Sequence, residues 1–533
     1  MLNKTHFLLA SFIAACANLS CTERGQEAST STATSEAIPN AALQCSDFAS
    51  MDLEGLVIDS AEAVTDREDL PHFCAIRGVI EPDIGFEARF PLTGWNGKYY
   101  QSGCGGYCGR VLPDKKGFSN TINKALQKAY ATITTNGGHS SESMGDASWA
   151  RGNARAVKVY AHEGIALTHQ AGTRMVKAYY GQQPSLNYFS GCSNGGRMAA
   201  MAAQRYPQLF DGILGGGAVL NLSHSGGIYG SWIVHSNTGP DGQRVLNRAN
   251  FAHKLPFLEQ VVIGQCDAMD GQIDGIVSQP RSCAVDVSAL PQCTESDEPD
   301  CFTQAEKKVL DLWYQGPRNS SGEQLFPGIP AGSERYWLVW FLDSDTRVAG
   351  GNALGGDYAR YLGFEEGAPE EYTALDFDFD RDPERLAANG RLLDALDSDL
   401  SVFRDAGGKY LMWHGWQDPL VLPDQSVDYY EDVLAEMGGR DEVDPFFRLF
   451  MIPGKGHCWE MPSGVPDRFD PIAMLENWVE KEEAPGRLNV HALDPDATVV
   501  PAAVICPYPG QPVYLDNAED ASGDYCGAAR ASD

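Results

Sequence analysis

The feature that most constrains this chain is a five-residue motif between a β-rich run and a helix-compatible run, Gly191-Cys192-Ser193-Asn194-Gly195. The β-rich run covers residues 186–190, and the helix-compatible run covers residues 196–206. In this G-x-S-x-G context the glycines permit a sharp strand-to-helix turn that projects the serine hydroxyl. The backbone N–H groups after the serine then face a developing oxyanion. We predict that Ser193 is a nucleophile and that the N–H of Asn194 is an oxyanion donor. A purely structural turn is the alternative.

Strand-like and helix-like runs alternate on both sides of this motif. The clearest β-rich runs are residues 86–90, 98–101, 129–134, 186–190, 408–413 and 446–452, and the clearest helical runs are 155–179 and 425–437. This alternation predicts an α/β fold with a mostly parallel sheet. It fails between residues 221 and 397, where Gly, Pro, Cys and acidic residues accumulate. We therefore interpret 221–397 as an inserted lid domain, with the catalytic domain formed by 41–220 and 398–533.

The beginning of the chain predicts export. Lys4 and His6 precede a short apolar run, residues 7–15, which is too short to span a bilayer but suits a secretory signal peptide. We assign residues 1–21 to this leader and residues 22–40, rich in Ser, Thr, Ala and Glu, to a disordered tether. The run ending at Cys16 resembles a lipoprotein cleavage site, of which the run ending at Cys21 is a poorer copy. Either a lipid anchor at Cys16 or a simple cleaved leader fits, so we expect a periplasmic, outer-membrane-anchored or secreted protein.

The chain has 14 cysteines. When Cys16 and Cys21 of the leader are left out, an even number remains, as expected if all of them form disulfides in an oxidising compartment. The sequence does not fix their connectivity. Short spacings suggest five pairs: Cys45 with Cys74, Cys104 with Cys108, Cys266 with Cys283, Cys293 with Cys301, and Cys506 with Cys526. Cys192 and Cys458 remain, far apart in the sequence.

A serine nucleophile needs a base and an orienting carboxylate, in the chain order Ser, Asp, His for this architecture. Asp418 and His457 each follow a predicted strand, where α/β folds place functional side chains. Cys458 follows His457 as Cys192 precedes Ser193, so a bridge between these cysteines would place the serine and the histidine side by side. His414 and His139 are rival bases, and each would otherwise bond to loop backbone.

The charge balance excludes some partners. The chain has 40 Lys and Arg against 72 Asp and Glu, a formal net charge of −32. Such an acidic surface repels phosphate backbones and anionic membranes, so we expect no nucleic-acid partner.

Together these motifs resemble the tannase and feruloyl esterase family of α/β-hydrolases. The likeness spans most of the mature chain, through Leu70-Pro71-His72-Phe73-Cys74, Ile84-Gly85-Phe86-Glu87, Gly94-Trp95-Asn96-Gly97-Lys98, the serine motif, Phe210-Asp211-Gly212-Ile213, the Cys266 to Cys283 segment, His414-Gly415-Trp416-Gln417-Asp418-Pro419 and Gly456-His457-Cys458. It implies an α/β-hydrolase fold with a large lid and a serine carboxylesterase acting on small aromatic esters of the feruloyl, galloyl, chlorogenate or terephthalate monoester type. It also implies the triad Ser193, Asp418 and His457, and a Cys192 to Cys458 disulfide.

The same resemblance implies a structural calcium ion in the lid. Its ligands would be the side chains of Asp267, Asp270 and Asp274 and the carbonyl groups of Gln272 and Ile276, which are oxygen ligands of the kind that Ca²⁺ prefers. The spacing is not that of an EF-hand, and an acidic turn held by a disulfide is the alternative. Serine chemistry itself requires no metal.

The second oxyanion donor is expected in the loop 103–109, through Gly105 or Gly106, because glycines let backbone N–H groups approach a ligand. Its two cysteines, Cys104 and Cys108, depart from the family pattern, and a glycine-rich turn is the alternative.

Within the lid, the aromatic run 336–341 would stack an aryl group or form lid core. Arg281 and Arg335 would pair with a substrate carboxylate or with acidic side chains. Two other functions stay open: another serine hydrolase, such as a peptidase or a hydroxyalkanoate oligomer hydrolase, and an exported calcium-binding protein without turnover.

Overall fold

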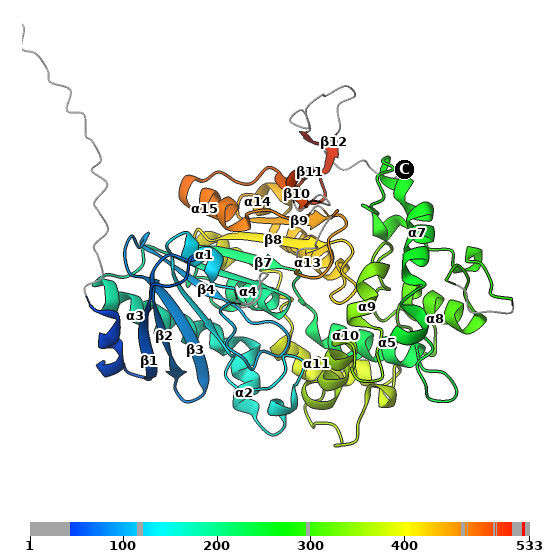
Figure 1. Cartoon of the computed structure of the whole chain (residues 1–533), viewed down its shortest axis with the longest axis horizontal. Coiled ribbons are helices and arrows are strands. Elements are labelled where there is room, and N and C mark those ends of the chain that lie inside the picture. Colours follow the sequence, from blue (N-terminus) through cyan, green and yellow to red (C-terminus); the bar gives the residue numbers. More distant parts are fainter. Residues whose placement is uncertain are drawn as a thin grey trace, which may run out of the picture. The chain divides into compact units, whose positions relative to one another are not determined.

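A nine-stranded sheet forms the centre of the structure, which is a computed structural model (Figure 1). The strands, in spatial order, are β1 (Leu56–Val64), β2 (Phe73–Ile80), β3 (Ile84–Pro91), β5 (Ala131–Thr135), β4 (Lys98–Ser102), β6 (Leu186–Cys192), β7 (Gly212–Gly216), β8 (Lys409–Gly415) and β9 (Phe447–Ile452). The six strands from β5 to β9 in this order are mutually parallel, whereas β1, β2, β3 and β5 pair antiparallel. The predicted mostly parallel sheet is confirmed, with an antiparallel edge added.

The structure describes residues 43–114, 121–294, 299–459, 464–465, 467–493, 496, 498–513 and 525–527. From residue 43 onward they belong to one compact unit. The predicted leader and tether, with Cys16 and Cys21, lie outside the described residues. None of the helices within the described ranges combines the length and the apolar character needed to cross a membrane.

Helices cover both faces of the sheet. The long helix begins with α2 (Ala154–Lys158), passes through a π-helical turn, η3 (Val159–Glu163), and continues as α3 (Gly164–Tyr180). On the same face lie α4 (Asn194–Arg205) and α13 (Asp424–Met437), whose apolar residues join one large core cluster. On the opposite face α15 (Pro471–Lys481) packs Ile472, Leu475 and Trp478 against β7 and β8. The other helices of this part are α1 (Asn123–Gln127), α14 (Arg440–Val443), η1 (Cys45–Ser50) and η2 (Ser148–Ala150).

Segment 221–397 lies between β7 and β8 in the chain, and its described residues form helices and irregular loops. Its α-helices are α5 (Gly230–Ser236), α6 (Arg248–Phe251), α7 (Leu255–Cys266), α8 (Gln304–Gln315), α9 (Trp337–Trp340), α10 (Gly350–Asp357) and α11 (Asp382–Leu393), and α12 (Ser401–Asp405) follows it. The shorter turns are η4 (His224–Tyr229), η5 (Asp267–Asp270), η6 (Pro280–Ser282), η7 (Val287–Ala289), η8 (Glu334–Tyr336), η9 (Tyr358–Leu362) and η10 (Ala374–Asp376). Trp313, Trp337 and Phe341 belong to the same core cluster as the sheet, so this segment is packed onto the sheet domain.

Two small antiparallel pairs follow near the end of the chain: β10 (Leu488–Leu493) with β11 (Val499–Ile505), and β12 (Gln511–Val513) with β13 (Tyr525–Gly527). The Cys506–Cys526 disulfide links the second pair to the end of β11. The structure also contains the other five pairings considered above: Cys45–Cys74, Cys104–Cys108, Cys192–Cys458, Cys266–Cys283 and Cys293–Cys301.

Candidate active site

Ser193 occupies the sharp turn between β6 and α4. Its φ of 65° and ψ of −125° lie in a region that non-glycine residues rarely adopt, and such strain is typical of a serine held on a strand-to-helix turn. The turn is possible because the backbones approach closely: a Cβ on Gly191 would lie 2.5 Å from the carbonyl group of Gly195. The motif therefore has the local geometry that its sequence predicts.

Asp418 and His457 form a short hydrogen bond beside this turn. The Nδ1 of His457 lies 2.6 Å from the Oδ2 of Asp418, and both side chains are buried. The N–H groups of Leu420 and Val421 donate to the other oxygen, Oδ1, each at 3.0 Å. Burial alone would raise the pKa of Asp418, but the facing His457 and the hydrogen bonds from two histidines lower it to about 2. The carboxylate is therefore charged at neutral pH and holds the proton of His457 on Nδ1, leaving Nε2 as the basic nitrogen.

The Cys192–Cys458 disulfide joins the end of β6 to the loop that follows β9, and these two strands are separated in the sheet by β7 and β8. Its Cα atoms are 6.0 Å apart, and its cysteines directly adjoin Ser193 and His457 in the chain. The groups converge around Gly217, where a Cβ would lie 3.3 Å from the Sγ of Cys192 and 3.5 Å from the Nδ1 of His457. The disulfide thus holds together the segments that carry Ser193 and His457, the predicted nucleophile and base.

The two rival histidines occupy other positions. His414 also contacts Asp418, with its Nε2 at 3.2 Å from the Oδ2 that His457 contacts and its Nδ1 at 2.7 Å from the hydroxyl of Ser426. His139 contacts the carbonyl group of Tyr107 at 2.6 Å and stacks on Trp149, and burial lowers its pKa to about 4. Both histidines therefore bond within the protein, as the alternative interpretation expected. The direct role of His414 in holding Asp418 was not foreseen.

The two oxyanion donors expected from the sequence face the same pocket. Ser193, Asn194 and Gly106 all line it, whereas Gly105 does not. Neither the N–H of Gly106 nor the N–H of Asn194 donates a hydrogen bond to any of the described residues. Both groups are therefore available to an oxygen atom held beside Ser193.

The pocket beside Ser193 is closed on its other sides by apolar and aromatic groups. They are Tyr107, Tyr160, Val219, Leu222, Tyr229, Phe341, Leu354, Leu420 and Val421, and glycines and the polar Ser225 of segment 221–397 also line the pocket. The three tyrosine hydroxyls donate to backbone carbonyl groups, those of Leu354, Gly106 and Pro419. Among the described residues, no charged side chain lines this pocket. It therefore suits an uncharged, flat group.

The residues of the aromatic run 336–341 lie in different environments. Trp337 is fully buried against Trp313 and is lid core. Phe341 lines the pocket, and the ring of Trp340 lies 5.5 Å from the ring of His457. Stacking of an aryl group on this run stays a prediction, and Trp340 and Phe341 are the residues of the run that lie near His457 and in the pocket.

Arg281 and Arg335 bind acidic side chains of the protein. Arg281 pairs with Asp424 at 3.1 Å and with Asp428 at 3.3 Å, and Arg335 pairs with Glu259. Neither arginine lines the pocket that contains Ser193. Their interpretation as partners of a substrate carboxylate therefore has no support in this geometry.

The segment predicted to bind calcium makes a series of tight turns between Cys266 and Cys283. Asp267 accepts a hydrogen bond from the N–H of Gly275 at 3.0 Å, and Asp270 and Asp274 each accept one from the residue two positions ahead. Burial, with the neighbouring Asp267 and Asp270, raises the pKa of Asp274. Within the described part of the chain, however, no three Cys, His, Asp or Glu side chains are grouped closely enough to hold a metal ion. The calcium site stays a prediction.

Comparison with known proteins identifies relatives over almost the whole chain. The family model for tannase and feruloyl esterase matches residues 72–526. An uncharacterized esterase of Xanthomonas campestris is 32% identical, over 91% of this chain and 92% of the relative. The mono(2-hydroxyethyl) terephthalate hydrolase of Piscinibacter sakaiensis is 31% identical, over 85% and 84%. Among solved structures, feruloyl esterase B from Aspergillus oryzae has a TM-score of 0.77 at 23% identity, covering 91% of this chain and 99% of that one. The structural likeness confirms the predicted fold.

Proposed function

This chain belongs to the tannase and feruloyl esterase family, and from that membership we propose that it is an exported serine esterase for esters of uncharged aromatic acids. It is a carboxylic ester hydrolase. The observation that carries the proposal is the 2.6 Å contact of His457 with Asp418, beside a serine held in the strained turn. Ser193, His457 and Asp418 are therefore the proposed catalytic triad.

In the proposed mechanism Ser193 attacks the ester carbonyl carbon while the Nε2 of His457 takes the hydroxyl proton. The N–H groups of Asn194 and Gly106 stabilise the oxyanion of the tetrahedral intermediate. His457 then returns the proton to the leaving alcohol, and an acyl-enzyme remains on Ser193. Water, activated in the same way, releases the acid. Asp418 stays ionised throughout, because it serves to orient and stabilise the protonated imidazole.

The pocket favours an uncharged aryl acid over a terephthalate monoester. Phe341 and the tyrosine rings offer faces and edges to an aromatic ring. A free carboxylate in this pocket would lose its hydration without meeting a cation from the residues that line it, which is costly. Feruloyl and galloyl esters carry phenolic hydroxyls instead of a charge. We therefore place them ahead of the terephthalate monoester, which a relative hydrolyses according to its name.

The test is the release of free acid from methyl ferulate, methyl gallate, chlorogenate and a terephthalate monoester, with Ser193→Ala as the matched control. We expect turnover of at least one uncharged aryl ester by the wild type and none by the variant. Faster hydrolysis of the terephthalate monoester would reverse the proposed order of substrates. An inert wild type would favour the non-catalytic alternative, and hydrolysis of anilides at rates similar to esters would favour a peptidase.

Export is supported by the six disulfides, because such bonds persist in oxidising compartments. We propose that the mature protein leaves the cytoplasm, with Cys16 as the candidate lipid-bearing residue. The test is fractionation of a bacterial host that expresses the full chain, with mass spectrometry of the mature N-terminus. Membrane association that is lost in Cys16→Ser would identify the anchor, and a soluble product with an unmodified N-terminus would exclude it.

We also retain calcium as a proposed structural ligand. Binding would draw Asp267, Asp270 and Asp274 together with the carbonyl groups of Gln272 and Ile276, and it would relieve the repulsion between the carboxylates. Thermal unfolding with excess Ca²⁺ and with EDTA tests this. A higher Tm with Ca²⁺, which disappears in Asp274→Asn, is the expected result, and an unchanged Tm contradicts it.

A further inference from the structure

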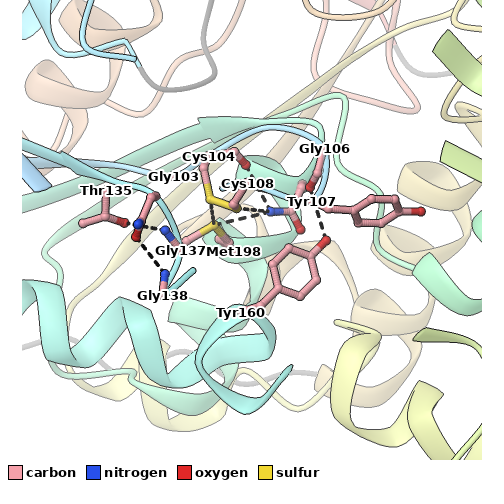
Figure 2. The surroundings of a disulfide bond; sticks show 12 residues. Gly103, Cys104, Gly106, Tyr107, Cys108, Thr135, Gly137, Gly138, Tyr160 and Met198 are labelled. Atoms are coloured by element: carbon pink, nitrogen blue, oxygen red, sulfur yellow. Dashed lines mark hydrogen bonds between the residues drawn. A yellow bond between two sulfur atoms is a disulfide. The ribbon is translucent and has the colours of Figure 1, made fainter. Parts of the chain in front are cut away.

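A short disulfide encloses the glycine that contributes the second oxyanion donor. Cys104 and Cys108 are joined across the loop that follows β4, and Gly106 lies between them (Figure 2). Both cysteines are about 1% exposed, so the bridge is inside the protein, and Gly106 and Tyr107 between them line the pocket. Gly106 has a φ of 58°, Cys108 a φ of 60° and Gly109 a φ of 84°, so three residues of the loop adopt the left-handed conformation that favours glycine.

The side chain of Asn194 ties this bridge to the nucleophile turn. Its Nδ2 donates to the carbonyl group of Cys104 at 3.1 Å and contacts the Sγ of Cys108 at 3.4 Å. Its Oδ1 accepts a hydrogen bond from the Nε of Arg197 at 2.8 Å. Because a guanidinium group has only donors, this contact fixes which end of the amide faces the disulfide. One residue thus supplies an oxyanion N–H and, through its side chain, holds the loop that supplies the other.

Arg197 anchors the arrangement. It is fully buried, and its remaining donors bond to the carbonyl groups of Tyr160, Ala161 and Leu393. Tyr160 in turn donates its hydroxyl to the carbonyl group of Gly106 at 3.2 Å (Figure 2). The loop is therefore held at the disulfide and at Gly106 by groups that belong to the same buried network.

The opposite side of the disulfide is packed against backbone. A Cβ on Gly137 would lie 2.7 Å from the Cβ of Cys108 and 2.9 Å from its Sγ, so the backbone there approaches the bridge as closely as glycine allows. Met198 of α4 lies 3.8 Å from the Sγ of Cys104, sulfur to sulfur (Figure 2). The bridge is packed between the segment that follows β5 and helix α4, which begins at Asn194.

We propose that the Cys104–Cys108 disulfide and the Asn194 side chain together position the oxyanion hole. A loop with glycines at 103, 105, 106 and 109 samples many conformations when it is open, and oxyanion donors stabilise a transition state only if they are already in place. The bridge removes that freedom without touching the substrate. The inference rests on the proposed serine esterase function, and it predicts an effect on the chemical step rather than on substrate binding.

The test compares the double variant Cys104→Ala/Cys108→Ala with the matched variant Cys293→Ala/Cys301→Ala, which removes another short bridge whose cysteines do not line the pocket. The substrate is methyl ferulate, or whichever ester of the panel the wild type hydrolyses best. We expect kcat to fall about 10- to 100-fold in the first variant, whereas KM should stay within about twofold of the wild-type value. Binding of phenylboronic acid, which forms a tetrahedral adduct on a reactive serine, should weaken in proportion, whereas product inhibition by the free acid should not. The matched variant should keep the wild-type kcat.

Asn194→Ala provides a second route to the same conclusion, because it keeps the backbone N–H but removes the side-chain link to Cys104. We expect a similar fall in kcat, and we expect the triple variant to lose little more than either parent, since both changes release the same loop. A wild-type kcat in the Cys104→Ala/Cys108→Ala variant, or a fall matched by Cys293→Ala/Cys301→Ala, would overturn the proposal. Full additivity in the triple variant would overturn it too. An inert wild type would overturn the proposed function, and this inference with it.

Discussion

The Asp418 carboxylate is shared by two histidines that have different roles. The Nε2 of His414 faces only acceptors, the Oδ2 of Asp418 at 3.2 Å and the carbonyl group of Val421 at 3.0 Å, so this nitrogen carries a proton. Its Nδ1 then accepts a hydrogen bond from the hydroxyl group of Ser426. We therefore expect His414 to act as a positioning residue, because it donates to the same oxygen of Asp418 that His457 contacts.

We expect His414→Leu to lower kcat by about tenfold, the value of a hydrogen bond to a charged group, with KM little changed. His414→Gln keeps a donor and should recover part of the loss. Steady-state kinetics on one ester measure both variants, with thermal unfolding as the control for folding. If Leu and Gln at this position give the same kcat as histidine, the hydrogen bond to Asp418 has no part in catalysis.

Ser225 is placed to recognise a substrate hydroxyl. It lines the pocket, and within the described part of the chain its buried Oγ makes no hydrogen bond. A buried polar atom without a partner is costly, and a phenolic hydroxyl would satisfy it. We expect Ser225→Ala to lower kcat/KM about fivefold to tenfold for methyl ferulate but not for methyl cinnamate, which lacks the phenol. Equal effects on both esters would show that Ser225 contacts something other than the phenol.

The residues of the candidate triad were predictable because their neighbours in the sequence mark them. Ser193 lies in a three-residue segment with a glycine on either side, and a predicted strand precedes both Asp418 and His457. The support around them was not predictable. Asn194 and Cys104 are 90 positions apart, and nothing in either segment indicates that an amide will meet that carbonyl group. Such contacts depend on how the segments pack, which local sequence patterns do not encode.

Most of the central strands were predicted as β-rich runs, because buried parallel strands are rich in apolar residues. The central strand β7 and the buried strand β2 were missed; three of the five residues of β7 are glycines, which are depleted in strands. The edge strand β1 was not predicted, because half of its side chains are exposed and charged residues interrupt the run. Helix α3 was predicted from its periodicity, but the π-helical turn before it was not. The pairs β10–β11 and β12–β13 were missed as well; each is a two-stranded sheet, and β12 and β13 have only three residues each.

The turn η8 contains a buried carboxyl group whose protonation should affect stability. Glu334 is fully buried; Tyr314 donates to its Oε1 at 2.7 Å, and no described residue bonds to its Oε2. Burial raises the pKa of Glu334 to about 7, against the opposing effect of the Tyr314 hydrogen bond. The folded state therefore holds this proton more tightly than the unfolded state, so the contribution of Glu334 to stability is present at low pH and is lost as pH rises toward 7.

Glu334→Gln removes this titration, so we expect its Tm to exceed that of the wild type at pH 8 and to differ little from it at pH 5. Thermal unfolding at the two pH values measures the difference. Glu306→Gln is the matched control, because Glu306 is also buried but pairs with Lys254 at 3.0 Å. It should lower Tm at both pH values. A Glu334→Gln variant that is less stable than the wild type at pH 8 would contradict the argument.

The net charge of −32 should make the enzyme sensitive to the charge of its substrate at long range. A chain of this charge repels anions, and the repulsion reaches about 30 Å at 0.01 M salt but only about 8 Å at 0.15 M. For a terephthalate monoester we therefore expect kcat/KM to rise with ionic strength over this interval, whereas for methyl ferulate, which is neutral, it should stay constant. Initial rates at substrate concentrations below KM measure this directly.

A rise for both esters would point to a general effect of salt on the protein, and a fall for the monoester would reveal a local cation that attracts it. The long-range repulsion and the lack of a cation in the pocket act in the same direction, and only the first of them is removed by salt. A preference for the neutral ester that persists at 0.15 M would thus be assigned to the pocket itself.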